Sequence, residues 1–169
     1  MTLNQFEDAV KGLLAEVAAM TLATCKGGLP WATDIYFAPD GYDLFFFSSP
    51  DSRHCLNLVL NPACAASVHP VATSWREIRG LQMEGTAGLV NSVKGKARAF
   101  MAYFGKFPFA RELMSSPSEA GPKIGKVTAH IFRPSRIRYL DNSLGFGTRF
   151  CVLLEAGTPI GPPEREGGV

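Results

Sequence analysis

Two glycine-containing turns near the start of the chain constrain the fold most. Lys26–Gly28 separates an apolar stretch at residues 20–25 from one at 30–38, and Pro39–Gly41 separates the latter from Leu44–Ser49. Turns this short join neighbouring strands in the antiparallel sense. A closed or nearly closed barrel would protect the edges of such strands.

The rest of the chain continues this pattern with helices inserted. Apolar residues recur at helical spacing in four segments, namely residues 3–18, the stretch from Pro50 to Asn61, 92–104 and 109–115. Further strands are expected at residues 63–69, 76–90, 126–132, 136–140 and 149–154, with a bend at Gly80 or Gly85 and a division at Pro134. The sequence predicts a mainly β fold with inserted helices (α+β), built as an antiparallel split β-barrel.

Composition favours one globular domain. The chain has 169 residues, 46% of them hydrophobic and 19% charged, which is enough for one core. We expect a single domain over residues 1–155, a loop at 115–122 rich in Ser and Pro, and a flexible tail at 156–169 rich in Gly, Pro and charge.

Several classes of protein are disfavoured. The net charge is only +2 and no Lys/Arg run occurs, so we expect no nucleic-acid partner. No apolar run approaches the ~20 residues of a membrane helix, and the N-terminus lacks a secretory core, so we expect no membrane association and a cytoplasmic location. The four cysteines form no C-x-x-C pair, and Cys55, Cys64 and His69 match no common zinc spacing. We therefore expect reduced thiols and no metal site.

The segment from Leu44 to Pro62 carries the strongest chemical signal. An apolar strand breaks at Pro50 and turns into a short helix, with polar residues at the junction, namely Ser48, Ser49, Ser52, Arg53 and His54. A helix start offers unpaired N–H groups and a positive dipole end, and hydroxyls with an arginine complete a seat for a phosphate. The alternative is structural, with Asp51 as an ordinary N-cap and Arg53 as a solvated helix residue.

An ordered series of motifs resembles a known family. Met20–Thr24, Gly28–Thr33, Leu44–Ser49, Ser52–His54 and Gly80–Ala87 resemble the pyridoxamine 5′-phosphate oxidase-like FMN-binding split barrels, in particular their small, poorly characterised branch. The resemblance spans about residues 4–140. It implies a homodimer with FMN at the subunit interface.

The resemblance also implies which residues hold the flavin. Ser48, Ser49, Ser52, Arg53 and His54 would bind the phosphate. Thr33, Asp34 and Ile35 would line the isoalloxazine edge through backbone groups, and Gln82 would contact the flavin.

The resemblance implies an FMN-dependent oxidoreductase acting on an unknown small molecule or electron donor, with no catalytic residue assigned. The flavin would carry the redox chemistry. The true oxidase has a C-terminal cluster of arginine and histidine residues that binds its substrate. Arg136, Arg138 and Arg149 are available here, but their spacing does not establish a match to that cluster.

Other readings stay open. One is a non-catalytic flavin- or haem-binding sensor, with three candidate haem ligands, His54, His69 and His130. Another is a deazaflavin-dependent reductase. The Asp141–Gly147 turn is either a plain hairpin or a segment closing over the partner's flavin.

Overall fold

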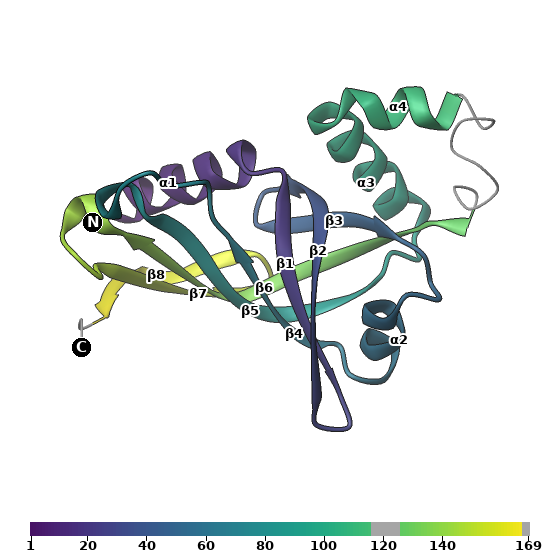
Figure 1. Cartoon of the computed structure of the whole chain (residues 1–169), viewed down its shortest axis with the longest axis horizontal. Helices are drawn as coiled ribbons and strands as arrows, with labels where there is room; N and C mark the ends of the chain where they lie inside the picture. Colours follow the sequence, from purple (N-terminus) through teal and green to yellow (C-terminus); the bar gives the residue numbers. More distant parts are fainter. Residues whose placement is uncertain (116–125, 167–169) are drawn as a thin grey trace.

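The computed structural model describes residues 1–115 and 126–166, which form one antiparallel sheet with helices around it (Figure 1). The helices and strands are, in chain order, α1 (Leu3–Glu16), β1 (Ala19–Lys26), β2 (Leu29–Asp40), β3 (Asp43–Ser48), α2 (Arg53–Leu60), β4 (Ala63–Val68), β5 (Arg79–Leu89), α3 (Val93–Lys106), α4 (Pro108–Ser115), β6 (Thr128–Asp141), β7 (Arg149–Glu155) and β8 (Thr158–Glu166).

Six of the strands close into a barrel. The sheet order is β3-β2-β1-β4-β5-β6-β7-β8, and β3 pairs in addition with β6. The length of β6 allows this, because Thr128–Phe132 pairs with β3 while Arg136–Leu140 pairs with β7. The barrel therefore opens at one side, where β7 and β8 continue the sheet. This confirms the predicted mainly β architecture with inserted helices and its split-barrel character.

One strand runs through the position where a division was predicted. β6 continues through Pro134 because the ladder with β5 shifts register there, with Gly85 opposite Pro134 and Glu84 opposite Arg136. A proline lacks the N–H that a regular ladder needs, but a bulge does not require it. The predicted division at Pro134 was wrong, and the predicted bend at Gly85 is confirmed.

The prediction of a flexible tail at residues 156–169 was wrong for residues 158–166. Thr158–Glu166 forms β8 and pairs with β7, from Glu155 opposite Thr158 to Arg149 opposite Glu166. The prolines that suggested disorder are compatible with this position, because β8 is the last strand of the sheet and one of its sides needs no hydrogen-bond donors. Residues 167–169 lie outside the described chain, as do residues 116–125 of the predicted loop.

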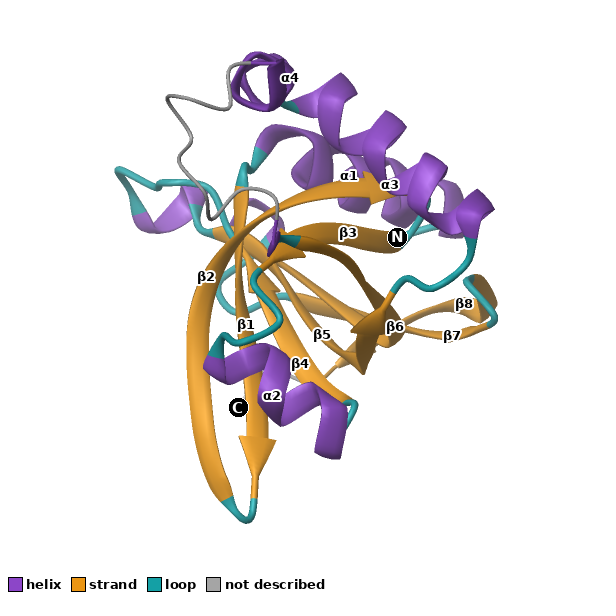
Figure 2. Cartoon of the chain, turned by 90° about the vertical axis from the view of Figure 1, so that its right-hand side faces the viewer, coloured by secondary structure: helices purple, strands orange, loops and turns teal. Residues whose placement is uncertain are grey.

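The helices close the ends of the barrel. α1 buries Phe6, Val10, Leu13 and Leu14 in the main core, and α3 covers a smaller cluster around Phe45 and Ala99. α2 lies at the opposite end from α1 and α3, beside the β1–β2 hairpin (Figure 2). No helix within residues 1–115 and 126–166 is long and apolar enough to cross a membrane.

Candidate functional site

The turn from β3 into α2 gathers the predicted phosphate residues. Ser48 Oγ lies 2.7 Å from His54 Nε2, Ser52 Oγ lies 3.1 Å from the same nitrogen, and the two hydroxyl oxygens are 3.3 Å apart. Both serines are half-buried, and His54 is only 8% exposed. The buried imidazole of His54 therefore contacts both hydroxyls from the interior side.

The start of α2 lacks a side-chain cap. Ser52 occupies the N-cap position but makes no capping hydrogen bond, because its hydroxyl donates to the Ser49 carbonyl oxygen at 2.8 Å. Asp51 precedes this N-cap by one residue, and its N–H donates to Ser49 Oγ at 3.4 Å, so Asp51 is not the N-cap that the structural alternative required. The first N–H groups of α2 are left to another acceptor, and an anion at a helix start fits that role.

Arg53 stacks on a tryptophan that sequence reasoning did not assign to the site. Its guanidinium carbon lies 4.3 Å from the centre of the Trp31 ring, within cation–π range. Stacking occupies the face of the guanidinium and leaves its N–H edge directed elsewhere. Trp31 thus restrains Arg53 beside the α2 start.

β2 has an uncovered edge beside this junction. β3 pairs with β2 only from Phe37 to Asp40, so no described strand pairs with residues 29–36 on that side. The Phe37 N–H donates to the Ala18 carbonyl on the β1 side at 3.2 Å. Backbone groups alternate in direction along a strand, so those of Asp34 point to the uncovered side.

The three predicted ring-edge residues therefore differ in what they can offer. The backbone groups of Thr33 and Ile35 point toward β1, and the Ile35 side chain is buried in the core. Only Asp34 combines an outward backbone with an exposed side chain, whose Oδ1 accepts a hydrogen bond from Thr21 Oγ1 at 2.7 Å.

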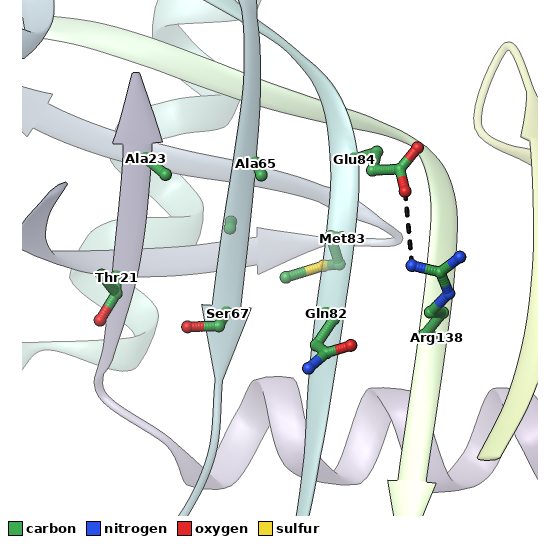
Figure 3. Close-up of a pocket in the computed structure, with 9 residues that line it drawn as sticks. Thr21, Ala23, Ala65, Ser67, Gln82, Met83, Glu84 and Arg138 are labelled. Carbon is green, nitrogen blue, oxygen red and sulfur yellow. Dashed lines mark ion pairs between the residues drawn. The ribbon is translucent and has the colours of Figure 1, made fainter. Parts of the chain in front are cut away.

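Gln82 lies apart from the junction, on the outer face of the sheet. Together with Thr21, Ser67, Glu84 and Arg138 it lines a groove of about 280 Å³ (Figure 3). The register places Asp34 opposite Thr21, Thr21 opposite Ser67 and Ser67 opposite Gln82. Most of the predicted residues thus form two groups, one at the junction and one, Asp34 and Gln82, in this cross-strand row, whereas Thr33 and Ile35 belong to neither.

The histidines differ in accessibility. Burial and the neighbouring His130 lower the pKa of His54, and burial lowers the pKa of His130. The Nε2 of His130 lies 3.5 Å from Cys55 Sγ, whereas His69 is exposed. In the described part of the chain, no three His, Cys, Asp or Glu side chains cluster as metal ligands would.

Comparison with known proteins places the chain in a family. A family model described as pyridoxamine 5′-phosphate oxidase matches residues 6–141. The chain belongs to this family. The UPF0306 protein YhbP of Escherichia coli is 26% identical over 152 residues, covering 89% of this chain and 95% of the relative.

Solved structures of other proteins share the fold. A candidate pyridoxamine 5′-phosphate oxidase of Listeria innocua matches with a TM-score of 0.60 at 19% identity, covering 80% of this chain and 98% of that one. A haem-binding protein of Mycobacterium smegmatis matches with a TM-score of 0.68 at 19% identity. The match covers 87% of this chain but only 57% of the mycobacterial protein. At these identities the likeness establishes the fold alone.

Proposed function

We propose that the protein binds FMN, with the phosphate at the β3–α2 junction and the ring along the uncovered edge of β2. The observation that carries this proposal is the position of the uncapped α2 start, with Ser48, Ser52 and Arg53, directly beside a strand edge that no described strand covers. Hydroxyls, helix N–H groups and an arginine suit a phosphate, and unpaired backbone groups suit the polar edge of an isoalloxazine.

Each residue has a distinct role in this proposal. The Arg53 guanidinium and the hydroxyls of Ser48, Ser49 and Ser52 bind the phosphate, while His54 holds two of those hydroxyls in place. The Asp34 backbone binds the ring edge. Gln82 is exposed on the outer face of β5, three strands from β2, so in this proposal it donates or accepts a hydrogen bond at the ring of the flavin held by the partner.

A second copy of the chain completes the site. The outer face of the sheet carries exposed residues of mixed character around the groove, including Ala23, Ala65, Gln82 and Leu153. Burying this face in a homodimer would place the partner over the β2 edge and enclose the flavin. We infer a cytoplasmic homodimer of FMN-binding domains that acts as an oxidoreductase, with the flavin supplying the redox chemistry when bound.

Two of the three arginines considered for a substrate phosphate, Arg136 and Arg138, are already engaged. Arg136 pairs with Glu84 at 3.3 Å, and Arg138 pairs with both Glu84 and Glu166, the latter at 2.8 Å. A guanidinium held by carboxylates is a poor anchor for another anion. The engagement of Arg136 and Arg138 favours a small-molecule substrate other than pyridoxamine phosphate.

Haem and a deazaflavin are the two alternative cofactors, and each can be distinguished from FMN. For haem, the Nε2 atoms of His54 and His130 already have partners, which disfavours both as iron ligands. A deazaflavin would share the ring-edge contacts and has a different mass from FMN.

The test is to identify what the purified protein carries. We expect a yellow protein with flavin absorption bands, FMN by mass spectrometry, and a dimer in sedimentation experiments. NADH or NADPH should reduce the bound flavin under anaerobic conditions. A colourless protein that takes up no added FMN would refute FMN binding, and a monomeric FMN complex would refute the shared site. A flavin that neither nucleotide reduces would argue against a reductase.

A further inference from the structure

We propose that His69 is the proton-transfer residue for the reaction at this site. The proposal rests on FMN binding as inferred above and adds a residue with a chemical role. His69 directly follows β4 and is exposed. It lines a cavity of about 230 Å³ together with Ala19, Thr21, Asp34 and Ser67.

The neutral imidazole has a defined proton position. His69 Nδ1 lies 3.3 Å from the Pro70 carbonyl oxygen, which can only accept a hydrogen bond, so Nδ1 carries the proton. The Nε2 lone pair is then the one that can take or return a proton. Of the three histidines in the chain, the other two are buried and their Nε2 atoms contact Ser48 and Cys55.

The backbone at His69 packs closely against Gly80 of β5. A Cβ at Gly80 would lie 2.8 Å from the Val68 carbonyl oxygen and 3.1 Å from His69 Cβ. Only a glycine lets the chain after β4 lie this close to β5. Ala19, Met20 and Thr21 of β1 line the same cavity.

The cavity adjoins the cross-strand row of the candidate site. Thr21 and Ser67 line it and also line the groove that contains Gln82. Asp34, whose backbone points to the uncovered β2 edge, lines it as well. His69 is therefore within the same continuous surface as the residues proposed to contact the flavin ring.

The charged groups around His69 come from two cavities. Asp34 is the other ionisable residue lining the His69 cavity, and its carboxylate accepts a hydrogen bond from Thr21 at 2.7 Å. A separate cavity on the far side of Pro70 is lined by Glu16, Arg76, Glu77, Arg79 and Asp141, and there Glu16 pairs with Arg79 at 2.9 Å.

The step is a two-electron reduction of a carbonyl, imine or quinone. When bound, reduced FMN would supply the hydride that forms the new C–H bond at the substrate carbon, while the C=X π electrons would move to the heteroatom X. The role of His69 is to give its Nε2 proton to X, so that the Nε2–H bond breaks as the X–H bond forms. The substrate would gain two electrons from the reduced flavin, and His69 would be left neutral with its proton on Nδ1.

The experiment compares His69→Gln with wild type, and uses Val71→Ala as a control because Val71 is 93% exposed on the same loop. FMN affinity is measured by titration, and the midpoint potential of bound FMN is measured from about pH 5 to about pH 9. Reduction adds negative charge beside His69, so wild type and Val71→Ala should take up about one more proton than His69→Gln. Their potentials should fall more steeply with pH, while all three proteins bind FMN within about threefold.

The outcomes separate the two proposals. A wild-type protein that binds no FMN refutes the proposed function. If FMN binds but His69→Gln has the same pH slope as wild type, the role of His69 is refuted and FMN binding stands. Long-range ¹⁵N NMR showing the neutral His69 proton on Nε2 would also overturn the role. So would a haem complex whose low-spin spectrum is lost in His69→Gln, because it would make His69 an iron ligand.

Discussion

At the scale of single residues, the candidate site consists of side chains that restrain one another. His54 holds Ser48 and Ser52 from a buried position, and Trp31 supports Arg53 through its ring face. Restrained groups lose less conformational freedom when a ligand binds, which favours a preorganised anion site.

The Trp31–Arg53 contact leads to a first prediction. In Trp31→Ala, the loss of a cation–π contact worth about 0.5–2 kcal/mol should weaken FMN binding roughly threefold to thirtyfold. Trp31→Phe should keep most of the affinity, because a phenyl ring still stacks on the guanidinium. Fluorescence titration with FMN and with riboflavin measures both effects. An equal loss for riboflavin would show that Trp31 contacts the ring system and does not act through Arg53.

The buried histidines predict how stability depends on pH. The pKa values of His54 and His130 lie below the ordinary 6.5 in the folded chain, so the unfolded chain binds more protons as the pH falls through that value. The free energy of unfolding should therefore decrease from about pH 7 to about pH 5. Denaturant titrations at these pH values measure it.

The matched variant is His130→Gln, in which the acid-induced loss should be smaller than in wild type, whatever the variant's stability near neutral pH. A free energy of unfolding that is constant over this range, or an equal loss in both proteins, would contradict the assignment.

At the scale of elements, β6 is the strand on which the fold depends most. It joins β3, β5 and β7, and the bulge opposite Gly85 lets it change direction between these partners. A Cβ at position 85 would lie 2.1 Å from the Arg133 carbonyl oxygen and 2.8 Å from the Pro134 Cα. Because these neighbours are backbone atoms, moving them aside would cost considerable free energy.

Gly85→Ala should therefore lower the free energy of unfolding by about 2 kcal/mol or more. Gly88→Ala is the matched control, because Gly88 is also on β5 and a Cβ there meets nothing within 4 Å. Urea denaturation of the two variants measures the difference. Similar stabilities for both would mean that the close approach at Gly85 does not constrain the bulge.

The elements also show which local signals can be read from sequence. The apolar spacing in α1 and α3 and the glycines of the β1–β2 turn, Gly27 and Gly28 at φ 58° and 77°, predicted their elements because the cause is local. Pro134 and the prolines of β8 led to the wrong predictions of a strand division and a flexible tail. A proline is excluded only from regular ladder positions that have a partner strand on both sides. Whether a position is a bulge or an edge depends on strands far away in the sequence.

At the scale of the whole molecule, the barrel and the site have one origin. β3 is shorter than β2, so part of the β2 edge is left without a partner, and the chain leaving β3 turns into α2 beside it. The junction residues were predictable because they are contiguous in sequence. Trp31, Thr21 and Ser67 were not, because only the strand register brings them to Arg53, Asp34 and Gln82.

The most direct test of the account is the affinity of Arg53→Ala for FMN and for riboflavin, which lacks the phosphate. Arg165→Ala, which removes the same charge from β8 away from α2 (Figure 1), is the control. A charge-assisted hydrogen bond contributes about 1.5–3 kcal/mol. Arg53→Ala should thus lose about tenfold to a hundredfold in FMN affinity and stay within about twofold for riboflavin. Equal losses for the two ligands, or no loss for FMN, would contradict a phosphate site at the β3–α2 junction.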